Sequence, residues 1–261
     1  MADRESPRVH YDRTIVTVSE LIWGEGFLAP GGADAVRAIV AGLTLDGLTV
    51  LDIGCGVGGA DKVLAEDHGC RVIGFDIVAL LIDIGRARMA EDGLAGRVEL
   101  RLVEPGPLAL DDGAVDVVFG KDSWLLIDDK PAFFAEVFRV LKPGGALAAS
   151  EWMGDGRPPS AAMQAYFDLR GMSYRLETAG TYGRLLVEAG FVDVAVTDTS
   201  DTYRAEARRE HERLQGSLRE AMTEVLGRDK QAHFVAQWAA MVRVLDLGEL
   251  RTGRLRASKP G

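Results

Sequence analysis

The chain has 261 residues, of which 47% are hydrophobic and 27% charged, values typical of an ordinary globular protein and not of a disordered one. Its net charge of −10 argues against a nucleic-acid backbone as the main partner, because that binding depends on Lys and Arg. Two cysteines, Cys55 and Cys70, exclude a disulfide framework. With no signal peptide or membrane span recognised, we expect a cytoplasmic protein.

Short apolar strands and helices alternate through the first 152 residues. Strands are predicted at 48–53, 71–75, 97–103, 115–119 and 146–152. Helices are predicted at 16–23, 33–41, 58–68, 78–91 and 131–141, the last followed by the stop signal "KPGG". Strands that are apolar along their whole length, separated by helices, indicate a parallel sheet covered on both faces.

The pattern changes after residue 152. Helices are predicted at 161–171 and 181–189, a sixth strand at 191–199, helices at 203–226 and 231–245, and a last strand at 249–258. We therefore expect one domain over residues 1–261. Its parts are a helical cap at 1–47, a ligand-binding core at 48–152, further sheet elements with a helical insertion at 153–248, and a last strand at 249–261.

The stretch "VLDIGCGVGG", residues 50–59, contains four glycines between a strand and a helix. A glycine-rich turn at the carboxyl end of a strand lets the backbone approach a ligand, and the helix that follows offers unpaired N–H groups. Gly54, Gly56 and Gly59 fit the dinucleotide pattern G-x-G-x-x-G, with Asp76 near the spacing of a ribose-binding acid. NAD is therefore one candidate ligand, although the pattern alone is a weak signal.

S-adenosylmethionine is the other candidate ligand. It has no pyrophosphate but carries a methionine ammonium group, which the carboxylate of Asp52, just before the glycines, suits better. Asp76 at the end of the second strand would accept hydrogen bonds from ribose hydroxyls with either ligand.

Four segments in order, "VLDIGCGVGG", "VIGFDI", "VDVVFGKD" and "VLKPGG", resemble the motif series of class I S-adenosylmethionine-dependent methyltransferases. The resemblance implies a Rossmann-like α/β sheet of seven strands, the last antiparallel, with S-adenosyl-L-methionine as cofactor and S-adenosyl-L-homocysteine as product. It places Asp52, Gly54 and Gly56 at the methionine end, Asp76 at the ribose and Glu104 at the adenine. Ile77 and Lys121 complete the expected cofactor-binding set.

Aromatic, acidic and basic side chains at the ends of the predicted strands are candidates for binding the methyl acceptor. They are His10, Tyr11, Trp23, Asp122, Trp124, Glu151, Trp152, Tyr166 and Arg170. Faces of Trp and Tyr attract methylated ammonium groups. A positioned carboxylate could orient an amine, and a base is needed only when the acceptor arrives protonated.

Within the methyltransferases, residues from Tyr11 to the end are similar to the phosphoethanolamine (phosphobase) N-methyltransferases. The similarity lies in "GEGFLAPGG", "GKDSWLLIDDKPAFF", "REHERL" and "RLRASKP". It implies that Tyr11 and Asp122 are the catalytic residues that hold the amine. It also implies that Tyr166 and Arg170 lie on the acceptor, with Arg170 contacting an anionic group.

The chain departs from that family at several positions. Leu126 stands in place of a His and Trp152 in place of a Tyr, Met241 replaces a phosphate-contacting Lys, and Pro30 or Ala29 replaces a Ser. A phosphate held by one Arg alone would be poorly compensated. The pattern therefore predicts the same scaffold with another acceptor.

The sequence thus predicts an S-adenosylmethionine-dependent methyltransferase acting on a small molecule, first of all an amine. Transfer to sulfur, oxygen or carbon stays open, as do an NAD-dependent oxidoreductase and a non-catalytic S-adenosylmethionine-binding protein. The late helices read as a lid or as a dimer surface, in a monomer or a homodimer. We expect no nucleic-acid partner, no membrane and no metal, because the four histidines are scattered along the chain.

Overall fold

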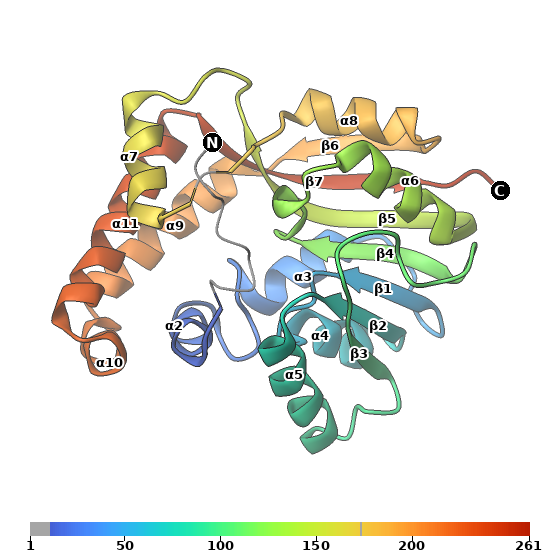
Figure 1. The fold of residues 1–261 in the computed structure, drawn as a ribbon, viewed down its shortest axis with the longest axis horizontal. Helices are drawn as coiled ribbons and strands as arrows, with labels where there is room; N and C mark the ends of the chain where they lie inside the picture. The colour runs from blue at the N-terminus through green and yellow to red at the C-terminus, as the bar shows by residue number, and fades with distance from the viewer. Residues whose placement is uncertain (1–10, 173) are drawn as a thin grey trace.

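The computed structural model describes residues 11–172 and 174–261. In this part of the chain a seven-stranded sheet has the order β3-β2-β1-β4-β5-β7-β6. The sheet is parallel from β3 to β5, and β7 lies antiparallel between β5 and β6 (Figure 1). The prediction of seven strands with the last one antiparallel is therefore confirmed.

The strand bounds follow the apolar segments of the sequence. They are β1 Thr49–Ile53, β2 Arg71–Asp76, β3 Val98–Leu102, β4 Val115–Lys121, β5 Leu141–Gly154, β6 Val192–Asp198 and β7 Leu250–Ser258. The prediction for β5 was too short at its start. Leu141 already pairs with Val115, and the register shifts before Ala146 pairs with Val117, so "KPGG" lies in an irregular first part of the strand.

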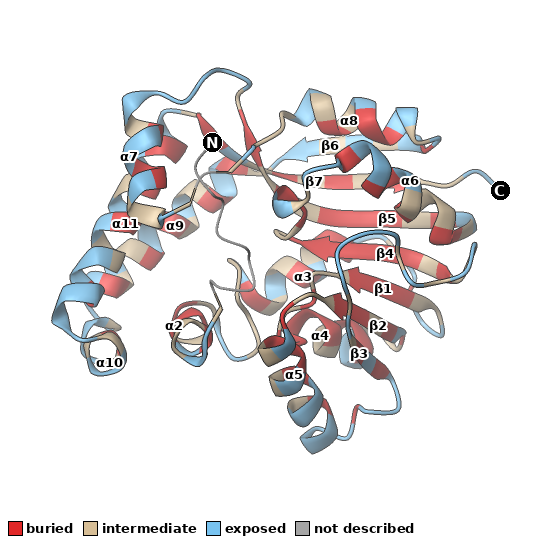
Figure 2. Ribbon diagram, in the orientation of Figure 1, coloured by how far each residue is buried: buried red, intermediate tan, exposed pale blue. Residues whose placement is uncertain are grey.

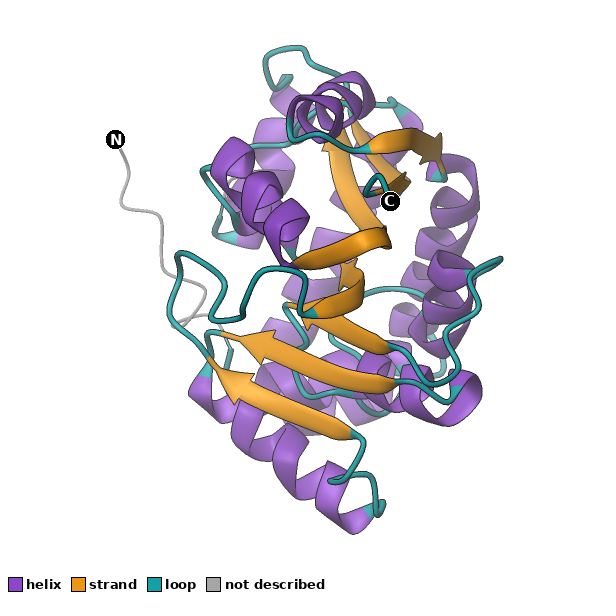
Figure 3. Ribbon diagram, turned by 90° about the vertical axis from the view of Figure 1, so that its right-hand side faces the viewer, coloured by secondary structure: helices purple, strands orange, loops and turns teal. Residues whose placement is uncertain are grey.

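Helices cover both faces of the sheet, as Figure 3 shows. The helices before the insertion are α2 Arg13–Trp23, α3 Gly32–Val40, α4 Gly59–His68, α5 Ala79–Glu91, α6 Lys130–Val140, α7 Ala161–Arg170 and α8 Ala179–Glu188. Side chains of α3, α4 and α5 pack with Val50, Val72 and Val98 on one face. Those of α6 and α8 pack with Leu51 and Val118 on the other. Successive residues of β1 point to opposite faces of the sheet. Because helices cover both faces, the residues on each face are apolar.

The late helical insertion consists of α9 Ser200–Gln215, α10 Arg219–Leu226 and α11 Arg228–Asp246. One long helix was predicted over 203–226, and the structure divides it at Gly216, whose φ of −112° and ψ of −102° are not helical. The insertion packs with α7 and α2 in a third apolar cluster, beyond the ends of β5 and β7. Figure 2 shows the buried side of these helices turned inward, while much of their outer side is exposed.

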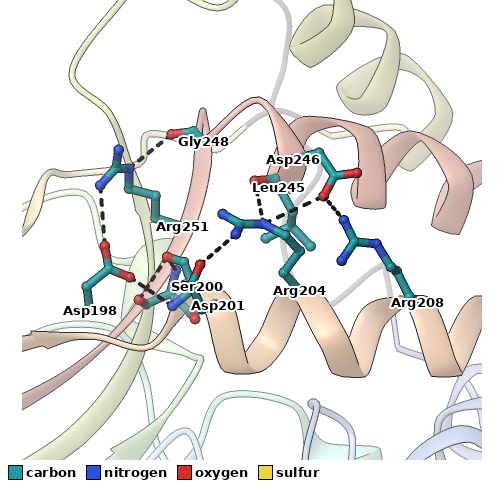
Figure 4. Close-up of polar contacts among 10 residues, drawn as sticks. Asp198, Ser200, Asp201, Arg204, Arg208, Leu245, Asp246, Gly248 and Arg251 are labelled. Carbon is teal, nitrogen blue, oxygen red and sulfur yellow. Dashed lines mark hydrogen bonds and ion pairs between the residues drawn. The ribbon is translucent and has the colours of Figure 1, made fainter.

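Polar contacts tie the base of the insertion to the sheet (Figure 4). Asp198 at the end of β6 accepts hydrogen bonds from the Ser200 backbone N–H at 2.8 Å and from Arg251 on β7 at 3.3 Å. Arg204 on α9 donates to the Leu245 carbonyl on α11 at 3.2 Å. These contacts join the point where the chain leaves the sheet to the point where it returns.

Candidate functional site: a glycine loop beside an aromatic pocket

Asp76 holds the glycine loop in shape. Its Oδ2 accepts a hydrogen bond from the Gly56 N–H at 2.9 Å, and its Oδ1 accepts one from the Val78 N–H at 2.9 Å. An ionised carboxylate has about four acceptor positions, and the backbone takes at most three of them, so capacity remains for a hydroxyl group of a ligand. The loop lies at the carboxyl ends of β1 and β2, where ligands bind in open α/β sheets.

The loop glycines are approached by the protein's own chain. A Cβ on Gly59 would overlap the carbonyl oxygen of Gly26, in the turn after α2. A Cβ on Gly54 would collide with Ser123, and one on Gly56 would come within 3.2 Å of the Leu28 side chain. Gly54, Gly56 and Gly58 also have positive φ angles. The glycines therefore serve internal packing and turn geometry, as well as any role toward a ligand.

Three carboxyl groups lie together beneath the loop. Burial, reinforced by the neighbouring Asp61 and Asp76, raises the pKa of Asp52 well above its usual value. Burial also raises the pKa of Asp61 to about 7 and, despite three backbone hydrogen bonds, the pKa of Asp76. Asp52 is 1% exposed and its Oδ1 has no hydrogen-bond partner, so a cationic donor at the loop would compensate it.

The other residues expected at the cofactor surround the same edge of the sheet. Ile77 is half-buried in a cluster with Tyr11 and Leu28. Glu104 is exposed, two residues beyond β3, where the neighbouring Val103 N–H donates to the Asp76 carbonyl. Lys121 is directed to the N-terminal turn: its Nζ donates to the Pro30 carbonyl at 2.6 Å and to Asp122 Oδ2 at 3.2 Å.

A pocket opens beside the loop, walled by the N-terminal turn, the end of β4, α7 and the insertion. Its lining comprises Tyr11, Trp23, Leu28, Ala29, Pro30, Asp122, Leu125, Leu126, Trp152, Tyr166, Arg170, Met172, Tyr174, Leu176, Tyr203, Gln237, Trp238, Met241 and Leu250. The structure thus brings together six of the residues expected at the acceptor, from sequence positions 11 to 170. They are Tyr11, Trp23, Asp122, Trp152, Tyr166 and Arg170.

Asp122 occupies an unusual backbone conformation, with φ of 58°. Such left-handed residues are uncommon outside glycine, and they concentrate at functional sites. Hydrogen bonds hold it there: its N–H donates to the Ser150 carbonyl at 3.0 Å and its Oδ1 accepts from Ser150 Oγ at 2.9 Å. The carboxylate is therefore fixed at the pocket wall by two strands.

Arg170 is the one Lys or Arg among the described residues that line the pocket. Its guanidinium donates to Tyr174 Oη at 2.8 Å, and it forms no ion pair with a carboxylate of the described residues. Burial raises the pKa of Tyr11 and of Tyr166 to about 12, even though the charge of Arg170 opposes the shift. Both phenols keep their protons at neutral pH, so this end of the pocket offers one positive charge and hydroxyl donors.

Three expected acceptor residues have other positions. Trp124 is 1% exposed, packs against Phe133 and Phe134, and donates from Nε1 to the Ile53 carbonyl at 3.1 Å. It lies in the core and does not line the pocket, because its ring is packed against Gly120. Glu151 is fully buried and accepts from the Trp152 N–H. His10 lies outside the described residues.

Sequence reasoning missed the pocket residues of the insertion, Tyr203, Trp238 and the buried Glu210 behind them. A signal was present in the helical spacing. Tyr203, Ala207, Glu210 and Leu214 recur at the spacing of one helix face and are all buried. Glu210 occupies an apolar position of that face, and a carboxylate at such a position points to a buried polar contact.

Two further findings concern the described residues as a whole. Within ranges 11–172 and 174–261 no helix has the length and hydropathy needed to cross a membrane. The same ranges contain no cluster of three His, Cys, Asp or Glu side chains that could hold a metal ion.

Comparison with known proteins agrees with the geometry of the loop. A profile described as a methyltransferase domain matches residues 50–145. The chain is 31% identical over 252 residues to phosphoethanolamine N-methyltransferase 1 of Arabidopsis thaliana, covering 96% of this chain and 50% of that protein. It is 29% identical over 175 residues to a sarcosine/dimethylglycine N-methyltransferase of Halorhodospira halochloris, covering 65% and 61%. The chain thus spans about half the length of the phosphoethanolamine N-methyltransferases it matches.

Solved structures share the fold. Phosphoethanolamine N-methyltransferase 2 of Haemonchus contortus, in complex with phosphomonomethylethanolamine and S-adenosylhomocysteine, superposes with a TM-score of 0.90 at 24% identity, over 97% of this chain and 59% of that one. A putative sarcosine dimethylglycine methyltransferase from Galdieria sulphuraria superposes with a TM-score of 0.81 at 20% identity, over 95% of this chain and 99% of that one. Residues 50–145 thus match a methyltransferase domain, and the described chain shares the fold of these solved methyltransferases.

Proposed function

We propose that this chain transfers a methyl group from S-adenosylmethionine to the nitrogen of a small amine that also carries an anionic group. The observation that carries the proposal is the pocket itself. Asp122, Tyr11 and Arg170 line one aromatic cavity, which shares the turn at Leu28 with the glycine loop. N-methyltransferases of small amines among the relatives support the choice of acceptor.

The residues of the loop fit this cofactor. Asp52 Oδ1, buried without a partner, suits the methionine ammonium group, and the remaining acceptor capacity of Asp76 suits a ribose hydroxyl. Ile77 and Glu104 would flank the adenosine. When bound, the cofactor supplies a methyl group already activated on a sulfonium, so the protein's task is alignment and the exclusion of water.

On the acceptor side, Asp122 would hydrogen-bond the amine and draw its proton away from the side that is methylated. Tyr11, with its pKa raised to about 12, acts in this proposal as a wall and hydrogen-bond donor and not as the base. Arg170 would hold the anionic group. A carboxylate suits one guanidinium better than a phosphate does, since Met241 stands at the same wall without a charge.

We also propose that the enzyme is cytoplasmic and that its helical insertion shields the pocket from water. Both cysteines are buried thiols, which agrees with a reducing compartment. The helices α9 and α11 contribute Tyr203, Gln237, Trp238 and Met241 to the pocket, which favours the shielding role over a purely external surface.

The test uses the purified chain and S-adenosylmethionine with a deuterated methyl group. Product mass would be followed for amino acids with primary and secondary amines, for phosphoethanolamine, and for a thioether. We expect label on an amine bearing a carboxylate, with turnover reduced at least tenfold in Asp122→Asn and unchanged in Asp111→Asn, an exposed loop residue. Label on the thioether alone would contradict the proposal of an amine acceptor. Binding of NADH in place of S-adenosylhomocysteine would contradict the proposal of S-adenosylmethionine as cofactor.

A further inference from the structure

Glu210 lies behind the pocket wall and is bonded to three of its aromatic side chains. Its Oε1 accepts from Trp23 Nε1 at 2.7 Å, and its Oε2 accepts from Trp238 Nε1 at 3.1 Å and from Tyr203 Oη at 3.3 Å. The three partners come from α2, α11 and α9, and all three line the pocket. Glu210 does not line it and is fully buried.

Burial raises the pKa of this carboxyl group, and the hydrogen bonds from Trp238, Trp23 and Tyr203 oppose that shift. An indole N–H can only donate, so two of the three partners require an acceptor on Glu210. Hydrogen bonds to the charged form favour that form. Within the described chain, no Lys or Arg forms an ion pair with Glu210. A buried carboxylate without a countercharge is costly unless a cation reaches its surroundings.

The rings in front of Glu210 form an aromatic cluster at the pocket wall. The ring centroids of Trp23 and Trp238 are 6.0 Å apart and tilted by 39°. Trp152 stands edge-on to Tyr203 at 4.9 Å. Aromatic faces attract ammonium groups, and a negative charge behind them in a low-dielectric interior adds to the attraction.

A second contact fixes the wall in place. Arg213, one turn after Glu210 on α9, donates to the Ile22 carbonyl at 3.0 Å, next to Trp23. Two side chains of α9 therefore bind the end of α2. Arg213 donates to the Ile22 carbonyl, and Glu210 accepts from the Trp23 indole. This pairing sets the orientation of the Trp23 ring that lines the pocket.

We propose that Glu210 is a specificity-determining residue that makes the wall of Trp23, Tyr203 and Trp238 bind a positively charged nitrogen of the acceptor or of its methylated product. The proposal rests on the proposed function and names what that pocket selects. Arg170 binds the anionic group and the Glu210 wall binds the cation, so the preferred ligands are zwitterions or ammonium compounds and not neutral amines or dianions.

The test measures binding and does not depend on methyl transfer. Tetramethylammonium and its uncharged analogue of similar shape, 2,2-dimethylpropan-1-ol, would be titrated into the protein, with tryptophan fluorescence as readout. The variants are Glu210→Gln and Trp23→Leu. The control is Glu206→Gln, one turn earlier on α9, whose carboxylate pairs with Arg209 at the surface. Thermal midpoint and S-adenosylhomocysteine affinity report on folding, and Trp23→Leu carries the test if Glu210→Gln does not fold.

We expect the wild type and Glu206→Gln to bind the cation at least fivefold more tightly than the uncharged analogue, and both pocket variants to lose that preference. Equal binding of the two probes to the wild type would overturn the proposal, as would an unchanged preference in folded Glu210→Gln or Trp23→Leu. Cation binding without methyl transfer to any amine would support the role of Glu210 and contradict the proposed function. Amine methylation without the preference would contradict the wall alone.

Discussion

Ser150 Oγ donates a hydrogen bond to Asp122 Oδ1 at 2.9 Å, across the pairing of β4 with β5. Lys121 holds the other oxygen of the same carboxylate at 3.2 Å. The sheet therefore fixes the orientation of a side chain whose own backbone, with φ of 58°, is in a sparsely populated region.

Ser150→Ala is expected to lower kcat/KM for the amine acceptor at least about tenfold, because a hydrogen bond to a charged group contributes about 1.5–3 kcal/mol and the carboxylate would lose one of the two groups that hold it. Steady-state kinetics check this value. Binding of S-adenosylhomocysteine, measured by calorimetry, should stay within twofold of the wild type. A loss of cofactor affinity with an unchanged acceptor KM would assign Ser150 to the loop and not to Asp122.

Gly59→Ala should destabilise the protein by about 1–3 kcal/mol, since the new methyl group would overlap the Gly26 carbonyl and backbone on both sides leaves little room to adjust. Affinity for S-adenosylhomocysteine should fall as well, because the loop and the turn after α2 would separate. Chemical denaturation and calorimetry measure the two effects. Gly96→Ala is the control, because no atom lies within 4 Å of the added Cβ and its φ is not positive.

Stability should fall as pH rises from about 4.5 to 8, partly because of Glu151. Burial, with the nearby charge of Asp122, raises the pKa of Glu151 to about 8 in the folded protein. The folded state then binds more protons than the unfolded state between the two pKa values, so its advantage is complete at low pH and lost as pH rises. Each pH unit between the two values corresponds to about 1.4 kcal/mol.

Glu151→Gln removes this proton uptake and keeps an oxygen for the Trp152 N–H. Its free energy of unfolding should therefore exceed that of the wild type at pH 8 by a few kcal/mol at most, and the difference should shrink toward pH 5. Urea denaturation at a series of pH values provides the comparison. A variant that parallels the wild type at every pH would show that Glu151 titrates normally in the folded state.

Arg251→Ala tests the polar network at the base of the insertion (Figure 4). The side chains of Arg251 and Asp198 are 46% and 52% exposed, and exposed ion pairs contribute little. We expect the free energy of unfolding to change by less than about 1 kcal/mol. A larger loss, measured by urea denaturation, would mean that these contacts hold the insertion more firmly than their exposure suggests.

Local patterns were enough to predict the sheet. The apolar runs around Leu51, Phe75 and Val118 and the glycine loop specify elements through neighbours in sequence. The break at Gly216 was missed, because a glycine flanked by helix-forming residues is compatible with a continuous helix. Trp124 was misplaced for a different reason: a tryptophan at a strand end suits a pocket or a core, and the decision lies with distant Phe133 and Phe134.

The contacts that build the pocket were beyond reach for the same reason. Glu210 and Trp23 are 187 positions apart. Gly26, in the turn after α2, contacts Gly59 at the start of α4. Such pairs depend on how α2 and α9 pack against one another, which no local pattern contains. The helical spacing that places Glu210 on a buried face is the one trace of this arrangement in the sequence.

The insertion enters and leaves the sheet at a single point. The Thr199 N–H donates to the Thr252 carbonyl at 2.9 Å, so β6 and β7 would form an ordinary antiparallel hairpin if the intervening helices were replaced by a turn. The strand order of the sheet thus does not depend on residues 200–246, whereas part of the pocket wall does. Exchanging residues 200–246 between chains of this fold would therefore alter the part of the pocket wall formed by Tyr203, Gln237, Trp238 and Met241 and leave the strand order unchanged.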